Sequence, residues 1–161
     1  MRVPSSLIIL FAMTTGCAKH SATYEQATAA GTADQADALL AEGMELWAGR
    51  DNAESLKGAL DKFEAAYTAD PTNREAATLL TRGWYFWGDV KTSDPDEKLS
   101  SWDTAVQWGG RCMAINSEFS ALMQKGNETE RTAIRVMTDE DAGCLYWAAS
   151  ALGKWAKLKG F

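Results

Sequence analysis

The chain has 161 residues, which favours a single domain, and 46% of them are hydrophobic, an ordinary share for a globular protein. The formal net charge is -6, and Lys and Arg form no basic stripe, which argues against nucleic-acid binding. The 7 Trp residues predict a substantial core or a large binding surface, because each Trp brings a large contact area.

The first residues, MRVPSSLIILFAMTTG, resemble a bacterial lipoprotein signal peptide. A basic start precedes an apolar run at residues 7–13, which is too short to span a bilayer. Small residues then precede Cys17, which predicts cleavage after Gly16 and lipidation of Cys17. Ala18 favours sorting to the outer membrane over the inner one. Thr14 stands where such signals usually have Leu, so cleavage without lipidation remains an alternative.

The rest of the chain divides into a tether and a helical domain. Residues 17–33 are small and polar, so we expect a flexible tether there. Residues 34–161 contain no alternating runs rich in Val, Ile and Thr, so strands are not predicted. We therefore predict a signal peptide at 1–16, a tether at 17–33, and an all-α domain at 34–161 with about six helices and no sheet.

The first predicted helix covers residues 34–47. Its apolar positions recur at three- and four-residue spacing, which is typical of one helical face: Leu39, Leu40, Gly43, Met44 and Trp47. A polar turn follows, in which Asp51 or Asn52 is a candidate N-cap for the next helix.

The second predicted helix, residues 53–69, carries the pattern Ala59-x3-Phe63-x2-Ala66-x4-Pro71. This is the second-helix signature of a tetratricopeptide repeat. The two Ala residues let helices approach closely, Phe63 fills the space between them, and Pro71 ends the helix. The pattern predicts antiparallel, tetratricopeptide-like helical hairpins, and an unrelated all-α hairpin is the alternative.

Further helices are predicted at 74–87, 96–108, 131–137 and from 139 onward. Asp94 and Thr138 are predicted N-caps, and Pro95 suits the first helical position. Gly109-Gly110 is interpreted either as a break after the 96–108 helix or as a close approach of two backbones. The segment QKGNETE is predicted to be a polar loop.

The last helix has an unusual composition. From Cys144 to Leu152, in CLYWAASAL, only Ser150 is plainly polar. A helix that is apolar on every side has to be covered on more than one side. We therefore expect this helix to expose apolar surface unless further protein covers it.

Several of these motifs together resemble the TatT family, the tetratricopeptide-like lipoproteins associated with TRAP transporters. They are the hairpin ending in ADPTN, the aromatic WYFWGD, the middle segment with Trp108 and Cys112, and LYWAASALGKWAKLKG. The resemblance implies a lipid-anchored periplasmic protein that forms a homotrimer. It implies a partner, the substrate-binding subunit of a TRAP system, and a hydrophobic groove for apolar ligands. Family members usually continue beyond GKW, so we expect this chain to be truncated at its C-terminus.

Aromatic residues from two segments are candidates to line such a groove, although core packing is the alternative for each one. They are Trp84, Phe86, Trp87, Tyr146, Trp147 and Trp155.

The sequence offers little for catalysis or metal binding. The single His, His20, lies in the predicted tether, so the domain lacks the base of a Ser-His-Asp or Cys-His unit. The three Cys residues form no CxxC pair, and no phosphate-binding glycine motif is present. The acidic run 139–141 is interpreted as a helix N-terminus rather than a metal site. We expect no enzyme activity, no cofactor and no metal.

The lipoprotein signal and the lack of catalytic motifs predict a non-catalytic periplasmic lipoprotein, and the resemblance to the TatT family implies that it binds a TRAP substrate-binding subunit, an apolar small ligand, or both. The alternative is a tetratricopeptide-like scaffold lipoprotein for envelope assembly or secretion.

Cys112 and Cys144 are a candidate disulfide. They are an even pair once Cys17 is lipidated, and the periplasm is oxidising. The bond would close a loop of about 30 residues. Two buried free thiols are the alternative.

Overall fold

The computed structural model describes residues 24, 25, 27–124 and 129–161, and within them it is all-α, without a strand, as predicted. The signal peptide and Cys17 lie outside the described residues. The α-helices are α1 (Ala33–Ala48), α2 (Ala53–Ala69), α3 (Arg74–Phe86), α4 (Pro95–Met113), α5 (Ser117–Gln124), α6 (Glu130–Ala133) and α7 (Ala142–Lys159). A π-helical turn, η1 (Trp87–Lys91), extends α3, and 3-10 turns lie at Ile134–Val136 and Asp139–Asp141.

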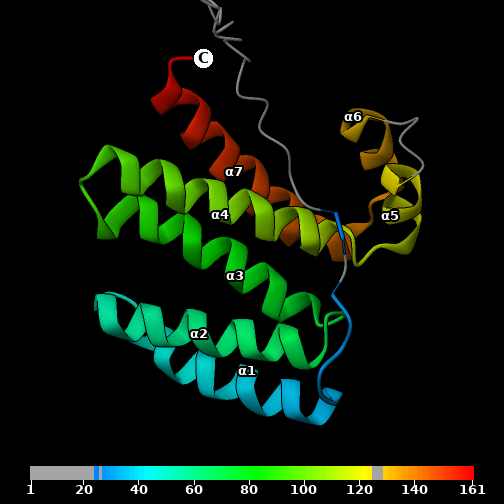
Figure 1. The fold of residues 1–161 in the computed structure, drawn as a ribbon, viewed down its shortest axis with the longest axis horizontal. Coiled ribbons are helices and arrows are strands. Elements are labelled where there is room, and N and C mark those ends of the chain that lie inside the picture. The colour runs from blue at the N-terminus through cyan, green and yellow to red at the C-terminus, as the bar shows by residue number, and fades with distance from the viewer. Residues whose placement is uncertain (1–23, 26, 125–128) are drawn as a thin grey trace, which may run out of the picture.

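The main helices form a stack. Figure 1 shows α1 to α4 side by side in chain order, with α7 packed along α4 and the short helices α5 and α6 at one end. Helix α7 contacts both α3 and α4, so it covers a groove between two helices rather than extending the stack by one more neighbour. The buried core runs through all these layers.

Polar side chains cap the starts of the long helices. Asn52 and Asn73 accept hydrogen bonds from the first free backbone N–H groups of α2 and α3. Asp94 does the same for α4, with Pro95 at the first helical position, as predicted. Thr32 and Gln35 form a reciprocal capping box at the start of α1. These local bonds explain why most predicted helix starts agree with the structure.

The hairpin of α1 and α2 is held by one large side chain set among small ones. Phe63 is fully buried, as are Ala59 and Ala66 on the same face of α2. Gly43 of α1 lies so close to the Phe63 ring that an added Cβ would come within 2.5 Å of it. The glycine therefore allows the ring to fill the space between the helices. Met44, predicted on the buried face of α1, is instead 41% exposed, so that part of the prediction is wrong.

Helix α4 continues through Gly109-Gly110 to Met113. The two glycines do not break the helix, and the other interpretation, a close approach, is the correct one. A Cβ on Gly109 would lie 2.4 Å from the Cβ of Ala148, so α4 and α7 touch at this point. Helix α5, which the sequence analysis did not predict, follows soon after α4.

A disulfide joins α4 to α7 close to α3. It links Cys112 to Cys144, the pair proposed from the sequence, with the Cα atoms 5.5 Å apart. Both residues are fully buried, and the hydroxyl oxygen of Thr78 on α3 lies 3.3 Å from the Cys112 sulfur. The disulfide therefore holds the start of α7 against the end of α4, next to α3.

A buried carboxylate adds an ionic contact beside the disulfide. Asp141, just before α7, is fully buried and pairs with Arg74 at the start of α3. It also accepts hydrogen bonds from the Thr138 backbone N–H and the Asn116 side-chain amide, both at 2.9 Å. Burial alone would raise the pKa of Asp141, but the hydrogen bonds and the Arg74 charge outweigh it and lower the pKa. Thr138 caps this turn, as predicted, although a 3-10 turn precedes α7.

Part of the segment predicted as a flexible tether lies against the domain. Ala30 and Gly31 donate backbone hydrogen bonds to Thr68 and Ala69 at the end of α2. Further back, the Tyr24 ring packs edge-on against Phe119 of α5, with 5.5 Å between the ring centroids. The described part of residues 17–33 therefore connects the two ends of the domain.

Candidate functional site

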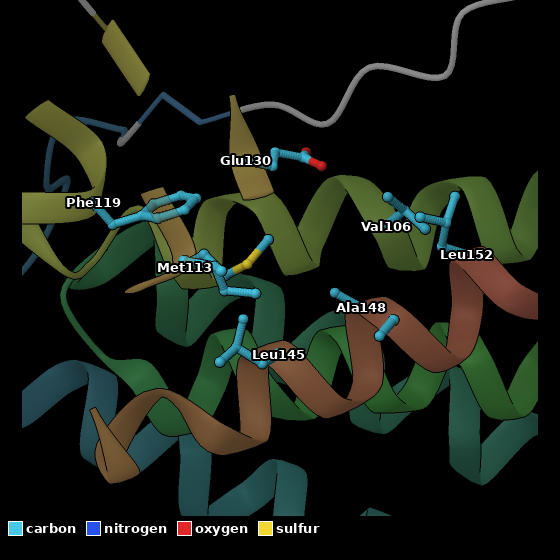
Figure 2. A pocket seen from close by; sticks show the side chains of 9 residues that line it. Val106, Met113, Phe119, Glu130, Leu145, Ala148 and Leu152 are labelled. Atoms are coloured by element: carbon cyan, nitrogen blue, oxygen red, sulfur yellow. The ribbon is translucent and has the colours of Figure 1, made fainter. Parts of the chain in front are cut away.

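An apolar cavity of about 130 Å³ lies between α4 and α7, below α5 and α6. Figure 2 shows Met113 of α4 and Leu145 of α7 pointing toward each other across it, with Phe119 at one end and Val106 and Leu152 at the other. The full lining is Val106, Met113, Phe119, Glu130, Ile134, Leu145, Ala148, Ala149 and Leu152.

The position of the cavity follows from the helices around it. The close contact of Gly109 with Ala148 holds α4 and α7 together at one point. Along α7, the small Ala148 and Ala149 lie between the longer Leu145 and Leu152, so space remains between the helices. Phe119, which is buried, closes one end of this space.

The lining of this cavity is almost entirely apolar. Glu130 is the one charged residue among the lining side chains, and it is exposed to solvent. The other walls are hydrocarbon, sulfur and aromatic ring, which favour an apolar guest by removing its surface from water. No pair of acid and base groups faces the space.

The six aromatic residues proposed for a groove lie in three different places, and none of them lines this cavity. Trp84 and Trp87 neighbour each other, with ring centroids 6.3 Å apart, beside a hollow of about 240 Å³ at the start of α4. The Trp87 indole N–H donates to Glu97 at 3.0 Å. These two residues therefore form a small surface of their own.

Phe86 and Trp147 belong to a second aromatic group. Their centroids are 6.0 Å apart. Tyr85 contacts both rings, and Trp47 contacts Phe86. Tyr146 packs edge-on against Trp147 at 4.8 Å and leaves 63% of its own surface exposed. This group joins α1, α3 and α7.

Trp155 lies near the end of α7. It stacks on Phe161, with centroids 6.2 Å apart, and packs against a small buried cluster around Trp102 that Trp84 and Tyr85 also contact. The aromatic character of these six residues therefore did not indicate which of their side chains would contact one another.

Sequence reasoning missed the residues that line the cavity. The signal for Leu145 was present, since it belongs to the apolar stretch that begins α7. Nothing local indicated that Phe119 or Ile134 would face it, because they come from short segments placed by tertiary contacts. Arg82, which lies against the aromatic group of Phe86 and Trp147, was also missed.

The described residues meet the requirements of neither a membrane span nor a metal site. Among the described residues, no helix has both the length and the apolar character needed to cross a bilayer. Within the same ranges, His, Cys, Asp and Glu side chains nowhere gather in a group that could hold a metal ion.

No protein-family model matches the chain, and neither does any curated protein. The resemblance to the TatT family therefore depends on the motifs quoted above and stays a prediction.

Proposed function

We propose that this protein is a non-catalytic, lipid-anchored periplasmic protein of the TatT type. In this proposal it binds an apolar small ligand, the substrate-binding subunit of a TRAP transporter, or both. The membrane attachment is the lipid on Cys17, and the outer membrane is the favoured location. The family resemblance supports the partner and the location, whereas the ligand is supported by the geometry.

The observation that carries the ligand proposal is the apolar cavity between α4 and α7. Its volume of about 130 Å³ is close to that of an engineered apolar cavity of about 150 Å³ that stays dry and binds benzene. A guest the size of one aromatic ring, or an equally small part of a larger apolar molecule, therefore fits.

Exposed apolar residues on α7 support a role in protein contacts, including the homotrimer that the resemblance implies. Tyr146, Leu152 and Leu158 are all exposed on this helix. The prediction that α7 exposes apolar surface agrees with these positions. Successive members of this set are six residues apart, so they point in three directions around α7, and each one offers a separate small contact to neighbouring protein.

Ligand binding is tested by titrating toluene into the protein and following the methyl signals of Met113 and Leu145 by NMR. We expect saturable shifts at these two residues. Ala149 lines the cavity but is itself exposed to solvent, so a larger side chain there adds bulk to the cavity wall without disturbing the core. Ala149→Leu should therefore weaken toluene binding by about tenfold or more.

The matched control is Ala142→Leu, which makes the same change at another exposed alanine of α7 that does not line the cavity. It should bind toluene like the wild type. Shifts that fail to saturate, or equal binding by both variants, would contradict the ligand proposal.

The anchor is tested separately. Cells fed a fatty-acid analogue should label the wild-type protein but not Cys17→Ser. Equal labelling of the two would show that Cys17 is not the lipidated residue.

A further inference from the structure

Arg82 of α3 is surrounded by aromatic rings from three helices. Its guanidinium carbon lies 5.1 Å from the ring centroid of Trp147, 5.2 Å from that of Trp47 and 5.5 Å from that of Phe86. These are cation–π distances, so the rings hold the guanidinium in place. The helices α7, α1 and α3 each contribute one of the three rings.

The aromatic rings do not satisfy the hydrogen-bonding capacity of Arg82. Its Nε is buried and has no hydrogen-bond partner. Arg82 as a whole is only partly buried, and its two Nη atoms reach solvent. Buried donors normally have a partner, so an unpaired guanidinium N–H in this position calls for an explanation.

A second arginine increases the positive charge at the same place. The Arg50 guanidinium carbon lies 5.3 Å from the centroid of the same Trp47 ring. Burial lowers the pKa of Arg82, and the charge of Arg50 lowers it further. Within the described part of the chain, no carboxylate pairs with either arginine, although the protein as a whole is acidic.

The neighbouring charges do not compensate for this pair. Lys91 adds another cation, because its Nζ donates to the backbone oxygen of Asp51 at 2.6 Å. Asp89 is already paired with Lys154. Two arginines thus contact the same Trp47 ring without a carboxylate paired to either in the described part of the chain, and Arg50 also donates to the Trp47 backbone oxygen at 3.2 Å.

We propose that Arg50 and Arg82 form a binding site for the carboxylate of a small organic anion that carries an aromatic or other apolar group. A carboxylate matches the planar fork of a guanidinium and would relieve the repulsion between the two cations. The exposed ring of Tyr146, packed against Trp147, provides apolar surface for the rest of such a molecule.

This site is separate from the apolar cavity. Its residues come from α1, the turn after α1, α3 and Trp147, whereas the cavity lies between α4 and α7 under α5 and α6. The two proposals therefore succeed or fail independently, since toluene binding and carboxylate binding depend on different residues.

The experiment is isothermal titration calorimetry with sodium benzoate, compared with the neutral benzyl alcohol. We expect saturable benzoate binding, and benzyl alcohol binding at least about tenfold weaker. Arg82→Gln and Arg50→Gln should each weaken benzoate binding by about 10- to 100-fold, because each removes charge-assisted hydrogen bonds. Arg82→Lys should also weaken it, because an ammonium group lacks the planar fork.

The matched control is Arg111→Gln. Arg111 also lies over an aromatic ring, that of Trp108 at 4.6 Å, but it belongs to α4. It should bind benzoate like the wild type. If Arg82→Gln proves unfolded by circular dichroism, Arg50→Gln decides the question, because Arg50 lies on the exposed turn after α1.

Three results would overturn the proposal. They are equal binding of benzoate and benzyl alcohol, equal loss of benzoate affinity in Arg50→Gln and Arg111→Gln, and sulfate binding as strong as benzoate binding. The last would indicate a general anion site rather than one for organic carboxylates.

Discussion

The hairpin of α1 and α2 and the region around the start of α7 are stabilised by different means. In the hairpin, Phe63 fits against Gly43 and two buried alanines, and the ionic contact beside this packing is the exposed Lys62–Glu42 pair. At the start of α7, a disulfide and the buried Asp141–Arg74 pair join segments that are far apart in the sequence. The first region is adjacent in sequence and forms by local packing, whereas the second depends on specific long-range bonds.

The difference shows how much cross-linking each region needs. Two helices joined by a short turn bring their faces together with little loss of chain entropy. The segment between Cys112 and Cys144 contains short helices with few buried side chains, so it gains less from burial. A covalent bond and a satisfied carboxylate compensate for that weaker core.

The largest effect is expected from Phe63→Ala. Removal of a fully buried ring from the hairpin should lower the free energy of unfolding by about 3–5 kcal/mol, because the surrounding helices close the cavity only in part. Urea unfolding followed by circular dichroism measures the change. The control is Phe161→Ala, whose ring is 87% exposed, and it should have little effect. A similar loss of unfolding free energy in both variants would show that the effect of Phe63→Ala does not come from packing in the hairpin.

Removal of the disulfide should have a slightly smaller effect, confined to the second region. The double variant Cys112→Ser, Cys144→Ser should lose roughly 3–4 kcal/mol of unfolding free energy, as expected for a closed loop of about 30 residues. Urea unfolding of the double variant and of the wild type measures this loss. Thermal unfolding of the wild type with and without reductant tests the same bond without a substitution. If reduction changes nothing in the wild type and two free thiols are counted in protein from the periplasm, the bond does not form in the cell.

The third prediction concerns Asp141 and pH. Asp141→Asn should lower the unfolding free energy at pH 7 by about 1–3 kcal/mol, because the buried network loses its negative charge and one of its two acceptor oxygens. The pKa of Asp141 is lower in the folded chain than its ordinary value of 3.8. Its contribution is therefore complete above that value and is lost as the pH falls through the folded pKa.

The measurement is the difference in unfolding free energy between the wild type and Asp141→Asn from pH 7 down to pH 2. The difference should shrink at the acidic end of this range. A matched variant, Asp61→Asn, removes a carboxylate of an exposed pair with Lys57 and should stay close to the wild type throughout. A gap that is constant with pH would contradict the role assigned to the Asp141 charge.

Much of the fold could be predicted because its signals are local. Asn52 and Asp94 mark helix starts because their side chains accept hydrogen bonds from the next few backbone N–H groups, and those bonds form in the structure. Pro95 marks the start of α4 through its fixed φ. Ala59, Phe63 and Ala66 of the predicted pattern on α2 are all buried, because residues at three- and four-residue spacing lie on the same face of a helix. Met44 failed that same rule, because it lies at the edge of the face that α2 covers.

The candidate sites were less predictable. The six aromatic residues were grouped by type, but the structure separates them into three places because neighbours on one helix point in different directions. Trp84 and Phe86 are close in sequence, yet their contacts lie with different helices. The cavity and the Arg82 surroundings require three or more segments at once, and no single stretch of sequence carries that information.

The sequence by itself determined the all-α class, the positions of the long helices and the small-to-large fit of the first hairpin, since spacing, capping and proline act over a few residues. The tertiary structure alone decided that Gly109 meets Ala148, that Asp141 is buried against Arg74, and that Arg82 is enclosed by rings from α1, α3 and α7. Those contacts depend on the angle and register at which helices pack, which are set by many side chains together.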